Sequence, residues 1–514
     1  MTEATTHPGE SHRAWLAGEK LRRLRIDTGT EHVVYLRPES PICRSEGFGA
    51  HSRLDLRAGD RHMHATLAIV HGDLITVDEA GLSESAWERL QPRAGERVII
   101  AHAASVDSLA CVRAKIYGKT LDNAALHDIV RDIVDHRYSN LELAAFITAC
   151  SDDHLSLAEI ISLTAAMVDT GQRLQWNSPV VVDKHCIGGL AGNRTTPIVV
   201  AIATSLGLVM PKTSSRAITS PAGTADTMAT LAPVALDEVS MRRVVEHCGG
   251  CIVWGGAMNL APADDILIRV ERALDIDSSG QMVASVLSKK IAAGSNHVIV
   301  DVPIGPTAKV RTDTEGHVLA TLLGDVADAF GLQLRVLLTD GRQPIGRGIG
   351  PALEAHDVLA VLQNRADAPA DLRQRALQVA AAVLELGGAA TATNAHTMAT
   401  ECLTSGRAWT QFQAICAAQG GIRTPGVAAH QQPVLASHAG TVTAIDNRRL
   451  SRVAKLAGAP LAPSAGLTLD AHLGQQVRQG QPLFTVHAQS PGELAYAMEY
   501  VSRHPTIVNL EEQP

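Results

Sequence analysis

The sequence predicts an α/β protein of several domains, and three observations support this fold class. The chain has 514 residues, whereas a single domain usually has about 100–200. Between residues 178 and 430, β-branched runs alternate with helical patterns, which is typical of a parallel sheet covered by helices. The segments 1–105 and 431–514 are rich in short strand-like runs, and the segment 106–177 is helical. We therefore expect four domains with these bounds.

The spacing of apolar residues supports a β-rich first segment and a helical second one. Residues 1–105 hold short alternating runs separated by Gly-Asp and Pro-Arg turn signals, such as His32–Leu36, Ala65–Val70 and Arg97–Ala101. From Asp122 the apolar residues recur at helical spacing. Ser139 and Ser156 each stand three residues before a glutamate, a capping box that favours the start of a helix. We expect a small β-rich domain followed by a helical one.

The two remaining segments differ in their pattern. Val298–Val302 and Leu334–Leu338 read as buried strands, with a helix expected from Asp313 between them. After Gln431, regularly spaced glycines separate short runs, which indicates a β-rich C-terminal domain.

Composition and charge narrow the function classes. The net charge is −8 and no block of five basic residues occurs, which argues against a nucleic-acid or anionic-membrane surface. No apolar run approaches the ~18 residues that span a bilayer, and the N-terminus does not resemble a secretory signal. We expect a cytoplasmic protein that acts on small molecules and has no nucleic-acid or membrane partner.

The eight cysteines are scattered over the chain, which favours reduced thiols over a disulfide framework. Only Cys248 and Cys251 have the C-x-x-C spacing of redox or zinc sites. No second pair or H-x-x-H partner follows at zinc spacing. We expect small buried residues at a glycine-rich turn and no metal.

The stretch 181–227 holds two consecutive strand-loop-helix units, around which the rest of the chain is organised. In the first unit a strand over 179–182 leads to a polar, glycine-rich loop over 183–195. Thr196 and Pro197 then have the residue types of an N-cap and a first helical position.

The second unit repeats this pattern. A strand over 208–210 leads to a Ser/Thr/Gly loop over 212–223, and Thr224 is expected to cap a helix that runs to Leu231. Each loop carries cations: Lys184 and Arg194, then Lys212 and Arg216. Cationic loops that end on helix N-termini bind anions, so the expected ligand is phosphate.

These loops carry a family resemblance. The runs Lys184–Gly189 and Ser214–Arg216, followed by Ala222–Asp226, resemble the two signature loops of the thymidine/pyrimidine-nucleoside phosphorylases. The amino-acid sequence of the second loop is more similar to that of the AMP phosphorylase branch. Similarity continues through Ala284–Lys290 into the C-terminal region, and the N-terminal segment resembles the extension of the long, second type of this family.

The resemblance implies a fold and an activity. The fold would be a helical domain plus a parallel α/β domain, as in nucleoside phosphorylases and anthranilate phosphoribosyltransferase, with the substrate between them. The protein would be a homodimer or higher homo-oligomer that uses inorganic phosphate as co-substrate and needs no cofactor.

The resemblance also implies the phosphate-holding and substrate-binding positions. Four residues match phosphate-holding positions, namely Lys184, Thr196, Ser214 and Thr224. The remaining substrate-binding candidates of the two loops are Gly189, Ser215, Arg216, Ala217, Ile218, Thr219 and Ser220. Cys186 replaces a serine of the short enzymes, so a weak thiol donor stands where a hydroxyl would contact phosphate.

Phosphorolysis also needs a group that protonates or hydrogen-bonds the departing base. His185 has a side chain suited to proton transfer near neutrality, although a purely structural hydrogen bond is an equal alternative. Asp277 matches the proton donor of AMP phosphorylases. Its pKa would have to be raised by burial or by Asp275, and the alternative is a helix N-cap before Ser278.

Base and nucleotide recognition are implied at four further positions. Arg269, Ser285 and Lys289 match the base-recognising residues of the pyrimidine enzymes, with one extra residue between Arg269 and Ser285. Lys309 corresponds to a nucleotide-binding lysine of the AMP branch; otherwise it would be a solvated lysine.

The expected function is a pentosyltransferase reaction with two substrate readings. One is phosphorolysis of thymidine to thymine and 2-deoxyribose 1-phosphate; the other, favoured by the loop wording, is phosphorolysis of AMP or a related nucleoside 5′-monophosphate to the base and ribose 1,5-bisphosphate. A phosphoribosyltransferase on this fold would want acidic residues for magnesium-bound pyrophosphate. A non-catalytic nucleotide-binding protein is the remaining alternative, and the combination of lysine, histidine, hydroxyls and glycines in both loops argues against it.

Overall fold

A computed structural model of the chain describes residues 19–93, 95–190, 192, 194–217, 220–276 and 278–512. Three candidate site residues, Ile218, Thr219 and Asp277, lie outside these described residues. The chain forms two compact units: the first holds the residues up to Lys119 together with Arg131–Ala149, and the second holds Thr120–Val130 and everything from Cys150 onward.

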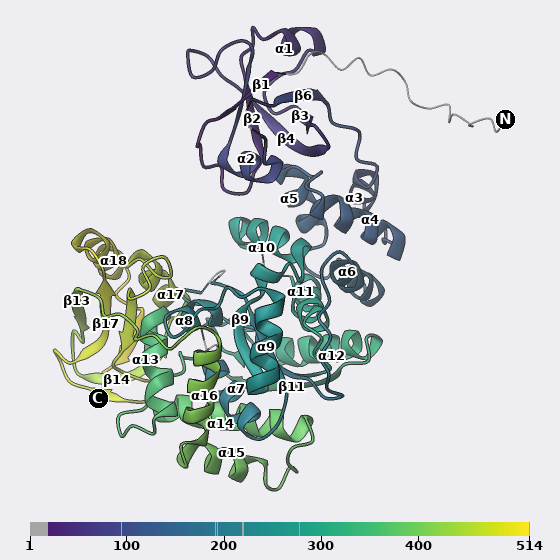
Figure 1. Cartoon of the computed structure of the whole chain (residues 1–514). Helices are drawn as coiled ribbons and strands as arrows, with labels where there is room; N and C mark the ends of the chain where they lie inside the picture. Colours follow the sequence, from purple (N-terminus) through teal and green to yellow (C-terminus); the bar gives the residue numbers. More distant parts are fainter. Residues whose placement is uncertain are drawn as a thin grey trace. The chain divides into compact units, whose positions relative to one another are not determined.

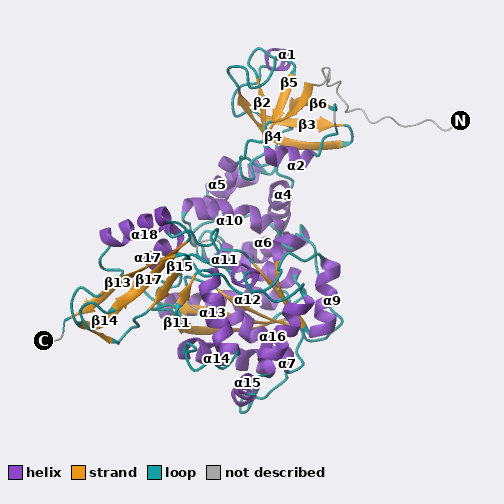
Figure 2. Ribbon diagram, turned by 60° about the vertical axis from the view of Figure 1, so that its left-hand side comes forward, coloured by secondary structure: helices purple, strands orange, loops and turns teal. Residues whose placement is uncertain are grey.

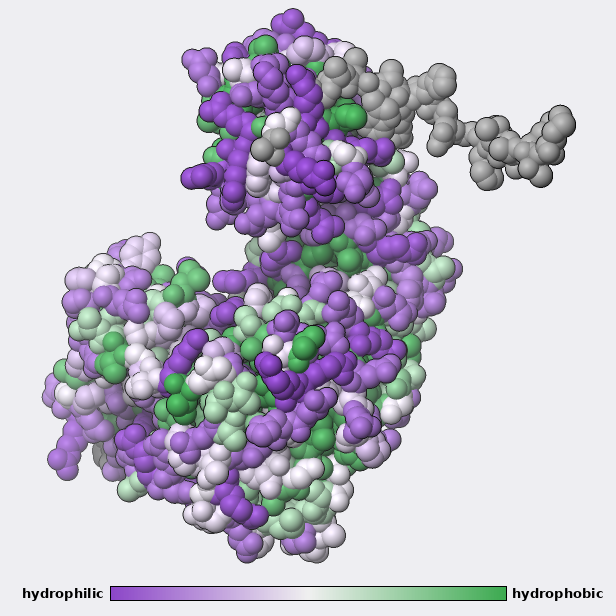
Figure 3. Space-filling model, viewed as in Figure 1, coloured by the Kyte–Doolittle hydropathy of each residue, from purple (hydrophilic) through white to green (hydrophobic). Residues whose placement is uncertain are grey.

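The first unit contains a closed barrel of six strands in the order β1-β5-β2-β4-β3-β6 (Figures 1 and 2). The strands are β1 (Glu19–Arg23), β2 (Val33–Leu36), β3 (Arg53–Ala58), β4 (Arg61–Ile69), β5 (Glu79–Leu82) and β6 (Arg97–His102). Their inward positions form an apolar core that includes Leu36, Leu56 and Leu67, and polar residues cover most of the visible barrel surface (Figure 3). Two short helices, α1 (Pro41–Glu46) and α2 (Glu84–Leu90), pack beside it. The predicted β-rich character is confirmed.

Four helices follow the barrel: α3 (Leu109–Ile116), α4 (Asn123–Val134), α5 (Asn140–Ala149) and α6 (Leu157–Asp169). Both predicted capping boxes are confirmed, since Ser139 and Glu142, and likewise Ser156 and Glu159, exchange backbone-to-side-chain hydrogen bonds. Helices α3 and α5 belong to the first unit and α6 to the second, while α4 contributes residues to both.

The second unit is built on parallel strands. Strands β11 (Gln333–Asp340), β10 (His297–Ile304) and β7 (Val182–Cys186) form one parallel sheet in that order. Strands β8 (Met210–Ser214) and β9 (Gly250–Trp254) form a parallel pair, which a bridge between Val181 and Val209 joins to the end of β7. The predicted parallel α/β class is confirmed.

Helices cover both sides of these strands (Figure 2). In chain order they are α7 (Thr195–Ser205), α8 (Thr224–Ala229), α9 (Glu238–Cys248), a 3-10 turn (Gly255–Met258), α10 (Pro262–Leu274), α11 (Ser279–Ala292), α12 (Asp313–Ala329), α13 (Pro351–Leu362), α14 (Ala370–Leu386), α15 (Ala395–Thr404) and α16 (Arg407–Ala418). Helix α7 is buried from Thr195 to Thr204 and lies in the largest apolar core, against α14 and α16.

The C-terminal segment is β-rich, as predicted. One antiparallel sheet has the order β12-β15-β17-β13 and a second has the order β16-β14-β18. Their strands are β12 (Gly348–Ile349), β13 (His430–Leu435), β14 (Gly440–Ile445), β15 (Gly466–Leu469), β16 (Gln476–Val477), β17 (Pro482–Ala488) and β18 (Val508–Glu511), with helices α17 (Asn447–Leu456) and α18 (Pro491–Arg503) against them. Because β12 comes from the α/β segment and pairs with β15, the two segments share a sheet.

The structure also tests the predictions about the cysteines and about membrane-spanning segments. All eight cysteines are free; Cys248 and Cys251 are buried on either side of Gly249, whose left-handed backbone ends α9. None of the helices in the described part of the chain is both long and apolar enough to cross a membrane.

Candidate active site

One cavity collects most of the predicted site residues. Its volume is about 1540 Å³, including the open solvent at its mouth. The lining comes from β7 and β8, the loops before α7 and α8, helices α10 and α11, and the loop after β10. This is the edge at which the parallel strands end, where ligands of open α/β sheets usually bind.

The strand boundaries differ from the sequence prediction. Lys184, His185 and Cys186 belong to β7, and Lys212 and Ser214 belong to β8, whereas both runs were expected in loops. The prediction was wrong because a run of charged and polar residues rarely forms a buried parallel strand. Here the polar side chains serve the cavity at the carboxyl ends of the strands.

The helix starts also differ from the prediction. Helix α7 begins at Thr195, so Thr196 and Pro197 lie inside its first turn, where a proline costs no intrahelical hydrogen bond. Helix α8 begins at Thr224 with Gly223 as N-cap, and it ends at Ala229, before Leu231. In both cases the threonine lies after the cap position, so its hydroxyl is not used by the cap.

A buried aspartate organises the lysines at the floor of the site. The carboxylate of Asp183, 1% exposed, lies 3.1 Å from Lys212 Nζ and 2.8 Å from Lys290 Nζ. Burial alone would raise the pKa of Asp183, but the two ammonium groups hold it below its ordinary value. Burial lowers the pKa of Lys290 to about 7, against the attraction of Asp183. Because Lys184, Lys212 and Lys290 all line the cavity, this end of it is cationic.

Lys184 is tied to the start of α7. Its ammonium, fully buried, donates to the Gly192 carbonyl at 3.2 Å, to Thr195 Oγ1 at 2.9 Å and to Thr196 Oγ1 at 3.4 Å. An ammonium has three donors, so these bonds hold it beside the first turn of α7. Lys184 and Thr196, both predicted phosphate contacts, therefore lie together.

His185 is neutral in this environment. Burial and the four lysines 290, 212, 289 and 184 lower its pKa well below 6.5. A neutral imidazole can donate a hydrogen bond but holds no extra proton to transfer at neutral pH. This electrostatic setting argues against His185 as the general acid and fits a hydrogen-bonding role.

Cys186 is an unreactive thiol at the same edge. It is buried, and burial together with Asp301 raises its pKa to about 11. The side chain therefore stays protonated near neutrality and offers only a weak donor to the cavity that it lines.

The second loop is held in shape by Asp226. Its carboxylate accepts from Ala217 N at 2.5 Å and from Gly223 N at 3.0 Å, and it pairs with Arg216 at 3.1 Å. The Arg216 guanidinium also lies over the Trp254 ring, 5.0 Å from its centre. The predicted residues of this loop that line the cavity are Ser214, Ser215, Arg216, Ser220 and Thr224.

The residues in and beside the second loop contribute to the site in different ways. Ala217 is not part of the lining, and it contributes its backbone to the turn. Ser214 Oγ is buried without a hydrogen-bond partner among the described residues, so it is free to donate to a ligand. A Cβ at position 223 would lie 2.6 Å from the Ser215 carbonyl, so the turn requires glycine there.

Helices α10 and α11 line the opposite wall. Ser285 and Lys289 both line the cavity, but Lys289 Nζ lies 2.5 Å from Asp264 Oδ2 and 3.5 Å from Ser285 Oγ. Although burial opposes it, Asp264 raises the pKa of Lys289 and keeps it charged. Arg269 is not among the lining residues, which agrees with the extra residue that separates it from Ser285.

Asp277 lies outside the described residues, so its predicted role as proton donor stays a prediction. Its neighbours Ile276 and Ser278 both line the cavity. The described N-cap of α11 is Ser278.

Lys309 reaches the site from the loop after β10. It lines the cavity, and its backbone nitrogen lies 2.8 Å from where a Cβ of Gly189 would be. Gly189 has φ +83°, so both the close approach and the left-handed backbone require glycine. The first loop and the Lys309 loop are therefore packed directly on each other.

Sequence reasoning missed several lining residues and misplaced one. Arg194 was expected to bind the anion, but its side chain does not line the cavity and is buried against Glu354 and the Gly348 carbonyl. Lys290 was noted only as part of a motif, and its partner Asp183 is 107 positions away. The acidic lining residues Asp265 and Glu271 on α10 carried no sequence signal beyond a helical face, and Asp275 was considered only as a neighbour of Asp277.

Comparison with protein families covers most of the chain. Residues 110–171 match the helical bundle domain of the glycosyl transferase family, and residues 178–409 match its a/b domain. Residues 441–507 match the pyrimidine nucleoside phosphorylase C-terminal domain.

Curated relatives match over almost the full length. The chain is 58% identical to "Putative thymidine phosphorylase 2" of Acidovorax sp. (strain JS42) over 99% of both chains. It is also 58% identical to "Putative thymidine phosphorylase" of Polaromonas sp. (strain JS666 / ATCC BAA-500), over 96% of both.

Solved structures agree on the fold. Anthranilate phosphoribosyltransferase from Thermus thermophilus superposes with a TM-score of 0.51 at 18% identity, covering 60% of this chain and 98% of that one. The Saccharomyces cerevisiae enzyme of the same name gives 0.50 at 15% identity, covering 62% and 98%. The predicted combination of a helical domain and an α/β domain is thereby confirmed, and the chain belongs to the pyrimidine nucleoside phosphorylase family.

Proposed function

We propose that the chain is a pentosyltransferase that splits a nucleoside N-glycosidic bond with inorganic phosphate. This proposal rests on the three lysines that line one end of the cavity, Lys184, Lys212 and Lys290, of which the last two are paired with Asp183. Three ammonium groups against one carboxylate leave an excess of positive charge when all are ionised, which suits a phosphate dianion.

The hydroxyls around this cluster complete the proposed phosphate site. Thr196 and Thr224 lie in the first turns of α7 and α8 and both line the cavity, so we propose that their hydroxyls bind phosphate oxygens. Ser214 supplies a buried hydroxyl without a partner among the described residues. Phosphate would bind these groups without any metal.

The proposed reaction is direct transfer of the sugar. A phosphate oxygen forms a bond to C1′ as the bond from C1′ to the base nitrogen breaks, and the base leaves with the bonding pair. Asp277 is proposed to protonate the base, and neutral His185 to donate a hydrogen bond to it. Lysines placed around phosphate orient this nucleophile and balance its charge.

Thymidine is the first proposed substrate, giving thymine and 2-deoxyribose 1-phosphate. The names of the relatives above support it. The proposal places Ser285 and Lys289 at the base.

A nucleoside 5′-monophosphate is the second candidate, and the cation distribution favours it. Two of the three positions expected to read a pyrimidine are compromised, because Arg269 does not line the cavity and Lys289 is paired with Asp264. Lys309 meanwhile lines the cavity from the loop after β10 and is proposed to hold the second phosphate group.

One assay tests both levels of this proposal. The purified protein is incubated with thymidine, uridine, AMP, CMP or UMP, with and without inorganic phosphate, and free base is measured. Release of base that requires phosphate supports the reaction; no release from any substrate refutes it. Turnover of thymidine without turnover of any monophosphate eliminates the second candidate, and the reverse eliminates the first.

A further inference from the structure

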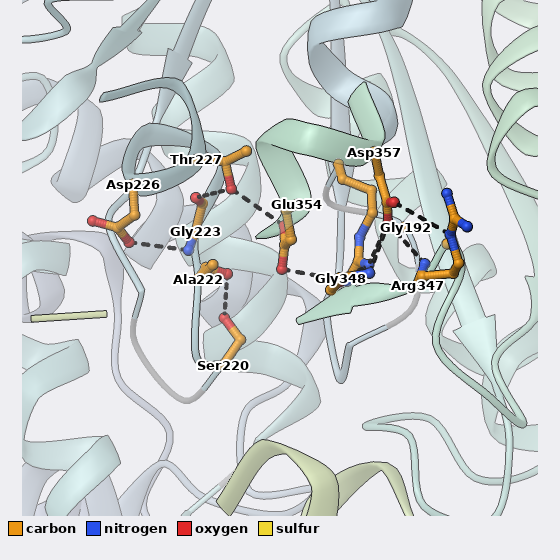
Figure 4. Close-up of polar contacts among 12 residues, drawn as sticks. Gly192, Ser220, Ala222, Gly223, Asp226, Thr227, Arg347, Gly348, Glu354 and Asp357 are labelled. Atoms are coloured by element: carbon orange, nitrogen blue, oxygen red, sulfur yellow. Dashed lines mark hydrogen bonds and ion pairs between the residues drawn. The ribbon is translucent and has the colours of Figure 1, made fainter. Parts of the chain in front are cut away.

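A buried polar bridge connects the two helices of the proposed phosphate site. It consists of Arg194, directly before α7, Glu354 in the first turn of α13, and Thr227 on α8. All three are at most 2% exposed. Figure 4 shows Glu354 between Thr227 on one side and Gly348 on the other.

The carboxylate of Glu354 is shared between the two helices. Oε1 accepts from Arg194 Nη2 at 3.3 Å, and Oε2 accepts from Thr227 Oγ1 at 3.2 Å. The two oxygens belong to one rigid, planar group, so the positions of Arg194 and Thr227 depend on each other.

Each end of the bridge is next to a cavity-lining hydroxyl. Arg194 precedes Thr195 and Thr196, both of which accept from Lys184 Nζ. Thr227 is one helical turn after Thr224, and its hydroxyl, which has a single proton to share between two acceptors, also lies 3.2 Å from the Gly223 carbonyl. A change in the spacing of the two helices would therefore move these groups away from a common ligand.

The other side of the bridge is fixed to the C-terminal sheet. Arg194 Nη1 donates to the carbonyl of Gly348, which is in β12, and lies 3.9 Å from Asp357 Oδ2. Asp357 in turn accepts from the backbone nitrogens of Arg347 and Gly348, both at 2.7 Å (Figure 4). Strand β12 pairs with β15, so α7, α13 and the sheet are held by one arginine.

A buried ion-pair bridge of this kind contributes little to the folding stability of a protein. Burying an ion pair costs so much desolvation that well-packed apolar residues of the same volume often stabilise equally or better. What the charged groups add is a defined geometry between elements far apart in the sequence.

We propose that Glu354 is a positioning residue, which sets the spacing of Thr196 and Thr224 so that both hydroxyls bind one phosphate ion. This inference rests on the proposed function, because it concerns the same phosphate site. Glu354 is not among the residues that line the cavity, so it acts through its neighbours.

The first test variant is Thr227→Val, which keeps the volume and removes only the hydroxyl that links α8 to the bridge. We expect the KM for phosphate to rise about ten-fold, the loss typical of one hydrogen bond to a charged group, with a smaller change in kcat and in the KM for the nucleoside. Thr227→Ser restores the hydroxyl and should restore the KM. The matched control is Thr164→Val, since Thr164 is also fully buried and donates only within its own helix.

Glu354→Gln is the second variant, and it keeps an acceptor while removing the charge opposite Arg194. We expect it to weaken phosphate more than Thr227→Val does. If it fails to fold, the threonine series still decides, because Thr227→Val leaves the ion pair intact. An unchanged phosphate KM in Thr227→Val, or equal losses in Thr227→Val and Thr227→Ser, overturns the inference.

A measurement without nucleoside separates this inference from the proposed function. Melting temperature is followed as inorganic phosphate is added. A wild-type protein that phosphate does not stabilise overturns the proposed function and the bridge with it. If phosphate stabilises the wild type and Thr227→Val at the same concentrations, only the bridge is overturned.

Discussion

The lysine cluster predicts that anion affinity depends on pH. Burial lowers the pKa of Lys290 to about 7, so its charge changes within the range in which the enzyme can be assayed. Sulfate is a suitable probe because it has the charge and shape of phosphate but does not itself titrate in this range. We expect sulfate to bind most tightly near pH 6 and to weaken as the pH rises to 8.5.

The sign follows from the direction of the shift. Below pH 7 Lys290 is mostly protonated in the free protein and attracts the anion; above pH 7 it is mostly neutral, and binding must first take up a proton. With a pKa of about 7, the charged fraction is about nine-tenths at pH 6 and about one-tenth at pH 8. Linkage then allows a loss of up to about ten-fold in affinity per pH unit above 7.

The total loss is limited by the value of one contact. A hydrogen bond between charged groups contributes about 1.5–3 kcal/mol, so the decrease should level off between about ten-fold and a hundred-fold. Neutral His185 adds no step, since its pKa lies well below 6.5.

The assay is the sulfate dissociation constant, measured by calorimetry from pH 6 to 8.5 in the wild type and in Lys290→Met. The variant should bind weakly at every pH. A flat wild-type profile refutes the reasoning. A slope that persists in Lys290→Met assigns the titration to another group, the first candidate being Glu354, whose pKa burial raises to about 7.

Three further predictions concern the proposed chemistry. Lys184→Ala should lower kcat/KM for phosphate by about ten- to a hundred-fold, because it removes a charge-assisted contact; phosphate kinetics that stay unchanged would contradict the site. Asp277→Asn should lower kcat by about 10²–10⁴ with KM nearly constant, and His185→Ala should cost less, because a neutral imidazole is not the acid. Rate measurements that show the larger loss in His185→Ala would instead assign the role of general acid to His185. Lys309→Ala should raise KM for AMP or CMP about ten-fold and spare thymidine; an equal effect on thymidine would separate Lys309 from the 5′-phosphate.

Local sequence patterns predicted the elements but not their ends around the site. The alternation of strands and helices is a local property, so β10, β11 and α12 follow the prediction closely. Lys184 to Cys186 read as a loop because charged residues seldom form a buried strand. The partners that make burial possible, above all Asp183 with Lys290, are brought together only by the fold.

Local sequence patterns also failed to predict the direction of the Arg194 side chain. Arg194 lies in a glycine-rich loop between Lys184 and Thr196, both predicted phosphate contacts, and this position suggested that its side chain binds the anion. Its true acceptors, Glu354 and Gly348, are 160 and 154 positions away. Local sequence contains no information on such a pair, whereas the loop motif itself was sufficient to locate the cavity.

The closed barrel of the N-terminal unit has a consequence for how that unit can associate. Each of its six strands is paired on both sides, and β1 closes the ring by bonding to both β5 and β6. An open sheet presents a row of unpaired backbone groups that a foreign strand can extend, and closure removes that row. The barrel is thus protected against strand addition, so a partner that binds this unit cannot do so by extending its sheet.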